Sequence, residues 1–397
     1  MTVITAGPAA CRDSSVVTAD LPTGRLTLTV ESSRRPVEDL LGFAARANPR
    51  RAFLFLSKVL GKHHPVRPAD MAATHRLLAD DVPAVGGPVV FIGMAETATG
   101  LGQGVFEAWI DAHPGAPALY LQTTRYRVDH AQRLDFEEAH SHAPRVFLHL
   151  PTDPAERASF AAARRVVLVD DELSTGNTFV NLVAVLRHAM PHLAGVHLAT
   201  LADFMGARRR SELGDTMGMA CSVGALIRGS WQFEHNGATI AAPAAQCAEG
   251  HEVRLADAGY GRLGRSQRLR ASADLVGRLA AETVPGTTLV VGTGEFMHAA
   301  FVLGRALEAA GADVRVQATT RSPILRWGAV THALAVPDPY HEGVANFIYN
   351  FAPGRYARVL ICHETAPDPA LFELARLLDA RLIHFQPDDH AEEVPVC

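Results

Sequence analysis

Residues 166–178 read Val-Val-Leu-Val-Asp-Asp-Glu-Leu-Ser-Thr-Gly-Asn-Thr, and this stretch decides the fold class. Its first four residues are apolar, which is typical of a parallel strand buried on both faces. The run ends in two adjacent carboxylates, Asp170 and Asp171, and a loop of small and hydroxyl-bearing residues then opens a helix predicted over 179–190. Strand, acids, loop and helix in this order predict a ligand site at the carboxyl edge of a parallel sheet.

The loop over 172–178 has the composition of a phosphate cradle. Its backbone N–H groups and the hydroxyls of Ser174, Thr175 and Thr178 surround one point, and the N-terminus of the following helix adds positive potential there. Gly176 allows close approach of the backbone to an anion. The two preceding carboxylates are suited to accept hydrogen bonds from vicinal hydroxyls or to face a hard cation such as Mg²⁺. A phosphate on one side and a diol on the other describe a ribose 5-phosphate.

Strands alternate with helices on both sides of this stretch, which predicts an α/β fold with a parallel, doubly wound sheet. The first half predicts strands over 26–30, 88–92, 118–122, 145–149 and 195–201, an apolar run over 53–56, and helices over 37–47, 71–79, 154–163 and from beyond Gly93 to Trp109. The second half predicts strands over 289–291, 314–317 and 359–362, and helices over 271–282, 297–310 and 371–378. Residues 1–20 show little hydrophobic periodicity and are expected to form a loosely ordered start of the chain.

Length and composition exclude several classes of protein. With 397 residues, of which 48% are hydrophobic and 20% charged, the chain is long enough for two or three domains with their own cores. The net charge of −5 argues against a nucleic-acid binder, and no apolar run is long enough to cross a bilayer. The five cysteines are scattered without a Cys-x-x-Cys pair, which indicates neither a disulfide framework nor a zinc site. These features predict a cytoplasmic enzyme without a membrane span.

The two halves of the chain carry similar short motifs. Ile-Gly-Met-Ala-Glu over 92–96 and Gln-Thr-Thr-Arg over 122–125 correspond to Val-Gly-Thr-Gly-Glu over 291–295 and Gln-Ala-Thr-Thr-Arg over 317–321. Residues 165–172 and 357–364 match more weakly. Either the chain is an internal duplication whose second half has lost the acidic pair, or any two strand–helix–strand units look alike at this length. The Ala- and Pro-rich residues 241–250 are the predicted linker between a domain over 1–240 and a domain over 250–397.

The strand, two acids and Thr-Gly-x-Thr loop resemble the phosphoribosyl-pyrophosphate signature of type I phosphoribosyltransferases. The resemblance implies a parallel sheet flanked by helices with an N-terminal hood, and Mg²⁺-dependent transfer of ribose 5-phosphate from phosphoribosyl pyrophosphate to a nitrogenous base or related acceptor. It implies that Asp170 and Asp171 hold the ribose hydroxyls and Mg²⁺, and that the donor contacts the loop residues Glu172, Leu173, Ser174, Thr175, Gly176, Asn177 and Thr178. Purine-salvage members usually carry an acid where Ser174 stands, which counts against a 6-oxopurine enzyme and leaves an orotate-like arrangement open.

A second loop follows the strand over 88–92 and consists of Gly93, Met94, Ala95, Glu96 and Thr97. In the resembled family the equivalent loop turns its amides toward pyrophosphate, often through an unusual peptide bond; the alternative is an ordinary strand-to-helix turn. Glu96 is unexpected beside an anion unless Mg²⁺ or a basic side chain intervenes. Arg125 and Arg127 are suited to bidentate phosphate contacts, with Arg125 a catalytic candidate, or are solvated loop residues.

Two further segments supply candidates through the resemblance. The region 128–144 is predicted to be long and irregular, and in the resembled family a mobile loop near this position closes over the site. His140 and His142 within it are candidates for acid, base or ligand, or for a structural role. Residues 53–65 are similar to the N-terminal hood of orotate phosphoribosyltransferases, which implies acceptor-side roles for Lys58, Lys62 and His63.

The second half contains Thr320-Arg321-Ser322-Pro323, which matches the tetrad that names the TRSP domain. That domain occurs C-terminal to a phosphoribosyltransferase domain in proteins encoded with bacterial tellurium-resistance and stress-response genes, and this context implies synthesis of a nucleoside-like metabolite. The motifs over 259–262, 292–297 and 346–350 also look like it. It is expected to be a Rossmann-like α/β domain, with phosphate-site candidates Gly292, Thr293, Gly294, Glu295, Arg321 and Ser322. The alternative is a purely structural partner domain.

A different class of function also fits these residues. Some transcription regulators keep the same fold to bind phosphoribosyl pyrophosphate or a nucleotide without turnover, although no helix-turn-helix or basic stripe is evident in this chain. Pyrophosphate release would separate an enzyme from such a regulator. Dimers are common in the resembled family, and the residues reveal neither an interface nor the identity of the acceptor.

Overall fold

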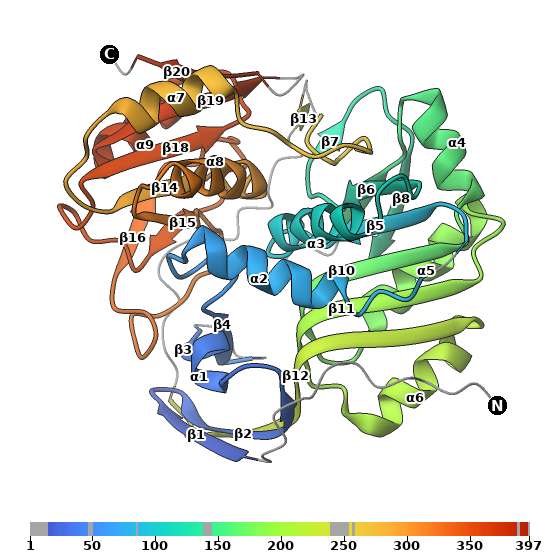
Figure 1. Ribbon diagram of the computed structural model, residues 1–397. Helices are drawn as coiled ribbons and strands as arrows, with labels where there is room; N and C mark the ends of the chain where they lie inside the picture. Colours follow the sequence, from blue (N-terminus) through green and yellow to red (C-terminus); the bar gives the residue numbers. More distant parts are fainter. Residues whose placement is uncertain are drawn as a thin grey trace.

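The computed structural model describes residues 15–46, 51–84, 86–137, 145–238, 254–255, 259–386 and 390–395. A seven-stranded sheet organises the first half, in the order β1-β2-β12-β11-β10-β5-β6 (Figure 1). Its strands are β1 (Ser15–Leu21), β2 (Gly24–Ser33), β5 (Val89–Gly93), β6 (Ala118–Gln122), β10 (Arg165–Leu173), β11 (Gly195–Asp203) and β12 (Ala220–His235). From β6 to β12 neighbouring strands are parallel, and β2 and β1 extend the sheet with antiparallel pairing. The α/β fold with a parallel sheet is confirmed.

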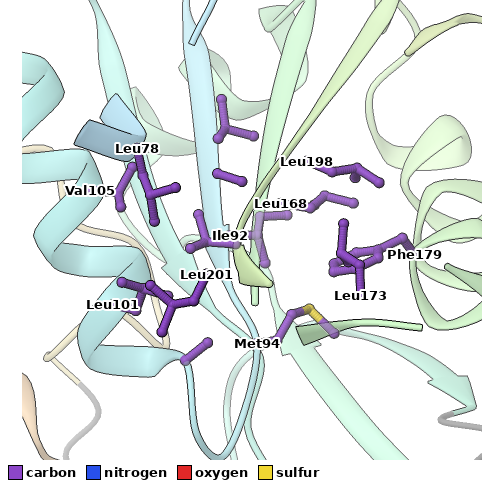
Figure 2. Packing of buried hydrophobic residues seen from close by; sticks show 14 of the residues in the cluster. Leu78, Ile92, Met94, Leu101, Val105, Leu168, Leu173, Phe179, Leu198 and Leu201 are labelled. Atoms are coloured by element: carbon purple, nitrogen blue, oxygen red, sulfur yellow. The ribbon is translucent and has the colours of Figure 1, made fainter. Parts of the chain in front are cut away.

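Helices pack on both faces of this sheet: α2 (Pro68–Ala79), α3 (Thr99–Ala112), α4 (Pro154–Ala162), α5 (Asn177–Ala189) and α6 (Gly206–Met217). Figure 2 shows Leu101 of α3 and Phe179 of α5 on opposite sides of the strand residue Ile92. Burial on both faces fixes the ends of β5 and β10 side by side, where Gly93 pairs with Val169. None of the helices that the structure describes is long and apolar enough to cross a membrane.

The N-terminal hood comprises α1 (Val37–Leu40), β3 (Leu41–Ala45) and β4 (Phe53–Ser57). The helix predicted over 37–47 is wrong beyond its first turn, because the chain leaves α1 to form β3, which pairs antiparallel with β4. Ala44 and Ala45 are fully buried in this pairing. Tertiary pairing and burial therefore override the local helix preference of the segment.

Three other expectations also change. Residues 15–20, expected to lie loosely, belong to β1, whose length is paired with β2. Within the region 128–144, predicted irregular, β8 (Arg133–Glu137) pairs with β9 (Arg145–His149), and β7 (Arg127–Val128) pairs with β13 (Arg254–Leu255). Strand β10 continues beyond its apolar residues because Asp170 and Leu173 pair with Thr200 and Asp203 of β11. The acid pair thus lies on the strand itself.

A second sheet follows in the order β15-β14-β18-β19-β20, built from β14 (Thr288–Gly292), β15 (Val314–Ala318), β18 (Arg358–His363), β19 (Ala380–Gln386) and β20 (His390–Val394). It is accompanied by α7 (Ala273–Ala281), α8 (His298–Ala309), α9 (Pro369–Leu378) and the pair β16 (Ala333–Val336) and β17 (Asn346–Tyr349). The parallel strands β15, β14, β18 and β19 repeat the order of β6, β5, β10 and β11. This shared topology favours the duplication over a chance likeness. Helix α8 packs against α2 and α3, between the two sheets (Figure 1).

Candidate functional site

The acid pair lies at the carboxyl edge of the first sheet. Asp170 and Asp171 are half-buried, and the N–H of Asp171 donates to the Asp170 carboxylate at 2.9 Å. Burial, together with the charge of Glu172, raises the pKa of Asp171 to about 6. Both oxygens of Glu172 accept from Nη2 of Arg51 at 2.8 Å. The hood therefore neutralises the third acid of the run, while the first two stand together at the sheet edge.

The predicted phosphate cradle leads from β10 into α5. Gly176 has a φ of +73°, the left-handed conformation that suits glycine, and α5 begins after it with no side-chain cap. Thr175 and Asn177 are exposed at this helix start. Helix α9, which follows β18 as α5 follows β10, is instead capped by Asp368, whose carboxylate accepts from the N–H of Leu371 at 2.8 Å. The N–H of Asn177 donates to Oγ1 of Thr175 at 3.3 Å. The other backbone N–H groups of the first turn, which no side chain caps at Gly176, are suited to an anion.

One cradle residue was missed by sequence analysis. Arg209, on α6, donates from Nε to the carbonyl of Thr175 at 2.9 Å and from Nη2 to Oδ1 of Asn177 at 3.0 Å. Arg209 is half-buried, and its guanidinium adds positive charge next to the start of α5. The run of three arginines over 208–210, soon after the strand predicted over 195–201, is the signal that was available.

The Gly93 loop forms the second part of the site, at the end of the adjacent strand β5. The N–H of Met94 donates to the carbonyl of Val169 at 2.9 Å, and the N–H of Ala95 donates to Oγ1 of Thr123 at 2.8 Å. The peptide bond between Ala95 and Glu96 is cis, the kind of unusual bond that the resemblance implies. The loop and the cradle therefore lie on neighbouring strands at one edge of the sheet.

Glu96 is matched by two basic side chains. Its carboxylate lies 2.7 Å from Nζ of Lys62 and 2.9 Å from Nε of Arg321, which comes from the second half of the chain. Burial opposes ionisation of Glu96, but the charges of Lys62 and Arg321 outweigh it and hold its pKa well below the usual range. The basic partners that an acid beside an anion site requires are thus present.

Arg321 also binds a second acid, Glu342, through Nη1 at 2.5 Å. Tyr126 donates its hydroxyl to the same carboxylate at 3.3 Å. Burial raises the pKa of Glu342 to about 7, although the charge of Arg321 acts in the opposite direction. These contacts consequently link the segment after β4, the Gly93 loop and the second half of the chain in one buried network of Lys62, Glu96, Arg321 and Glu342.

The corresponding loop of the second domain makes a reciprocal connection. The N–H of Gly294 donates to Oγ1 of Thr319 at 2.9 Å, as the N–H of Ala95 does to Thr123. The buried Glu295 then accepts from Oγ1 of Thr124 at 2.6 Å and from the N–H of Arg125 at 3.1 Å. Each loop glutamate is therefore held by the Thr-Thr-Arg segment of the other half.

The second sheet fills its own equivalent of the acid edge. Gly292 pairs with Cys362 as Gly93 pairs with Val169, so Glu364 takes the register position of Asp171. Arg262 is fully buried and donates to Glu364 at 2.6 and 2.9 Å, and the Tyr340 hydroxyl donates to it at 2.8 Å. Thr293 is also buried, with its carbonyl accepting from Tyr340 at 3.2 Å, and the carbonyl of Ser322 accepts from Tyr349. Arg262 and Tyr340 therefore bind the acid at the edge of the second sheet, at the position that corresponds to Asp171 in the first sheet.

The predicted acceptor-side residues separate into two places. Lys58 donates to the carbonyl of Glu38 at 2.7 Å and lines a cavity of about 650 Å³ together with Phe43 and Trp327. Lys62 is fully buried at Glu96. His63 follows it and is also buried.

The remaining candidates are placed as follows. Arg125 is half-buried beside Glu295, and Arg127 lies in β7. His140 and His142 lie outside the described residues.

Magnesium, implied by the resemblance, fits the donor set at the sheet edge. Asp170 and Asp171 offer carboxylate oxygens, and Mg²⁺ is commonly bound by one or two carboxylates together with substrate phosphates. No group of three or more His, Cys, Asp or Glu side chains that would hold a metal ion exists within the part of the chain that the structure describes. Asp170 and Asp171 are the residues that would hold Mg²⁺, with substrate phosphates as its other ligands.

Two protein families match the chain. One, described as phosphoribosyl transferase, matches residues 40–230, and the other, described as the TRSP domain C-terminal to it, matches residues 259–380. No curated protein matches the chain.

Several solved structures are similar to the first half. Adenine phosphoribosyltransferase from Rhodothermus marinus is 14% identical, with a TM-score of 0.32, over 47% of this chain and 94% of that one. The Trypanosoma brucei enzyme, in complex with AMP, pyrophosphate and ribose-5-phosphate, is 14% identical, with a TM-score of 0.35, over 50% and 82%. Mycobacterium tuberculosis orotate phosphoribosyltransferase is 17% identical, with a TM-score of 0.29, over 48% and 90%.

Proposed function

Because residues 40–230 belong to the phosphoribosyl transferase family and residues 259–380 to the TRSP domain that follows it, we propose that this chain transfers ribose 5-phosphate from phosphoribosyl pyrophosphate to a base-like acceptor. The observation that carries the proposal is the juxtaposition of three features at one sheet edge. The acid pair, the uncapped start of α5 at Gly176 and the Gly93 loop follow two neighbouring strands. They offer separate partners for a diol, a phosphate and a pyrophosphate.

The chemistry asks the protein chiefly to hold its substrates in place. The bond from the sugar C1 to pyrophosphate breaks, its electron pair leaves with pyrophosphate, and an acceptor nitrogen forms the new bond to C1. Where that nitrogen carries a proton, the proton passes to the released pyrophosphate or to water. Asp170 and Asp171 accept hydrogen bonds from the ribose hydroxyls, and the α5 amides hold the 5-phosphate. Lys62 and Arg321 stand beside the loop where pyrophosphate binds. Bound Mg²⁺ supplies neutralisation of pyrophosphate charge.

Incubation with phosphoribosyl pyrophosphate, Mg²⁺ and a panel of bases, with pyrophosphate release as the readout, tests the function. The double variant Asp170→Asn, Asp171→Asn should abolish release and keep the wild-type circular dichroism spectrum. Asp274→Asn, at an exposed position on α7, is the matched control and should release pyrophosphate at the wild-type rate. Unchanged activity of the double variant would refute the assignment.

The same experiment separates an enzyme from a regulatory protein. Calorimetric binding of phosphoribosyl pyrophosphate without pyrophosphate release, for every base in the panel, would favour a ligand-sensing role. We further propose a domain boundary within 241–250 and, from the context of the resembled TRSP proteins, a nucleoside-like product used in a stress response.

A further inference from the structure

Two side chains of the N-terminal segment carry unsatisfied polar atoms next to the proposed reaction centre. Nε of Arg46 and Nε2 of His63 are buried, and neither has a hydrogen-bond partner within the described residues. The His63 residue is only 6% exposed. Leaving a buried polar atom without a partner is costly, so such atoms call for a ligand that satisfies them.

Arg46 and His63 lie near the two parts of the site that the proposed function assigns to the donor. Arg46 directly follows β3, and its guanidinium lies within range of the charge of Asp171. His63 lies within range of Glu96, in the Gly93 loop, and of Arg46 itself. His63 also directly follows Lys62, whose Nζ lies 2.7 Å from the Glu96 carboxylate. The pair therefore lies near both the acid pair and the Gly93 loop, which the proposed function assigns to the sugar and to pyrophosphate.

The charges of this region leave Arg46 without a counterion. Arg51 is bonded to Glu172 at 2.8 Å, and Lys62 and Arg321 are bonded to Glu96 at 2.7 and 2.9 Å. Arg46 forms no ion pair within the described residues. A guanidinium is always charged and is suited to paired oxygens, so an anionic oxygen group is the ligand that it fits.

His63 and Tyr349 supply uncharged contacts at the same place. Burial, followed by the charge of Lys62, lowers the pKa of His63 to about 3, so its imidazole is neutral at physiological pH. The Tyr349 ring lies with its centroid 6.0 Å from that of His63, and its hydroxyl donates to the carbonyl of Ser322 at 2.6 Å. Tyr349 is itself fully buried and stacks on Phe347 with the ring centroids 5.8 Å apart, so it contributes to the apolar surroundings of His63.

We propose, on the basis of the transfer function proposed above, that Arg46 and His63 bind the acceptor, and that the acceptor is a planar nitrogen heterocycle bearing a carboxylate or a comparable acidic oxygen group. The acidic oxygens accept from Arg46, and a polar atom of the ring bonds to Nε2 of His63. A neutral base leaves Arg46 unpaired, so the charge of the acceptor determines specificity.

The test compares acidic heterocycles with their uncharged counterparts: orotate with uracil, and nicotinate with nicotinamide. Pyrophosphate release is measured with each, and binding is measured by calorimetry in the presence of phosphoribosyl pyrophosphate. Arg46→Met should lower kcat/KM or affinity for the acidic compound by ~10- to 100-fold, the range for a hydrogen bond to a charged group. The KM for phosphoribosyl pyrophosphate should not change, and Arg46→Lys should recover part of the loss.

Thermal stability separates a binding role from a structural one. Because Nε of Arg46 is buried without a hydrogen-bond partner, Arg46→Met should keep or raise the melting temperature, and Arg278→Met on the exposed face of α7 is the matched control. A fall in melting temperature without a change in acidic-over-neutral preference would overturn the inference. So would release with neutral bases only, which leaves the transfer function intact. Failure to bind phosphoribosyl pyrophosphate would instead refute the transfer function itself.

Discussion

The ion pair between Glu96 and Arg321 predicts a strong energetic coupling between the two halves of the chain. The partners are 225 residues apart in sequence and meet at 2.9 Å, with 12% and 14% of their side chains exposed. Replacing Arg321 by methionine leaves Glu96 with Lys62 alone and leaves Glu342 without its arginine. The variant therefore leaves the buried carboxylates of Glu96 and Glu342 with less positive charge to balance them.

The size of the effect follows from this burial. Removing one partner of a buried pair costs ~3–5 kcal/mol, and because Lys62 stays 2.7 Å from Glu96 we expect the lower end for Arg321→Met. In a double-mutant cycle with Glu96→Gln the coupling free energy should be about 2 kcal/mol. The exposed pair Arg208–Glu212 is the control: its side chains are 93% and 46% exposed, and its coupling should stay below about 0.5 kcal/mol.

Urea unfolding followed by tryptophan fluorescence measures both cycles, with the denaturant slopes compared to ensure a common unfolded state. Arg321→Met should in addition raise the KM for phosphoribosyl pyrophosphate, since it removes one of the two positive charges that neutralise Glu96 in the Gly93 loop. If the Glu96–Arg321 coupling is no larger than that of Arg208–Glu212, the two halves are not joined energetically through this network, and the reasoning fails.

Three further outcomes follow from single sites. Gly176→Ala should lower the free energy of unfolding by ~1–2 kcal/mol, because φ of Gly176 is +73° and an added Cβ would lie 3.1 Å from the Leu213 side chain. Calorimetry should show weaker binding of phosphoribosyl pyrophosphate to this variant, and unchanged binding would contradict the role of the loop as a phosphate cradle. Burial raises the pKa of Glu342 to about 7 from a usual 4.5. Its contribution to the free energy of unfolding is therefore full below pH 4.5 and is lost as the pH rises through 7. The melting temperature of the wild-type protein should fall over this pH range, and that of Glu342→Gln should lack this fall. Arg262→Met should lower the free energy of unfolding by ~3–5 kcal/mol, since it removes the arginine that pairs with the buried Glu364 and Glu295. An unchanged urea midpoint would argue against this stabilising role of Arg262.

The hood shows where local sequence patterns fail. A helix over 37–47 was expected, but β3 forms because β4 pairs with it, and no local signal in 41–45 indicates that partner. Lys58 and Lys62 lie four residues apart and were assigned to one role, yet the first lines a surface cavity and the second is fully buried at Glu96. Arg46 was not singled out because its missing partner is visible only once the surrounding residues are placed.

The sequence alone determined the buried strands, the acid pair and the cradle, because apolar runs, adjacent carboxylates and a glycine before a helix are local features with local consequences. The carboxyl ends of parallel strands meet at one edge, so Asp170 and the Gly93 loop could be brought together without coordinates. Only the tertiary structure decided that Arg321 of the second domain neutralises Glu96 and that Arg262 fills the equivalent edge of the second sheet. Those pairings depend on distance and burial between residues far apart in the chain, and local backbone preferences contain no information about either.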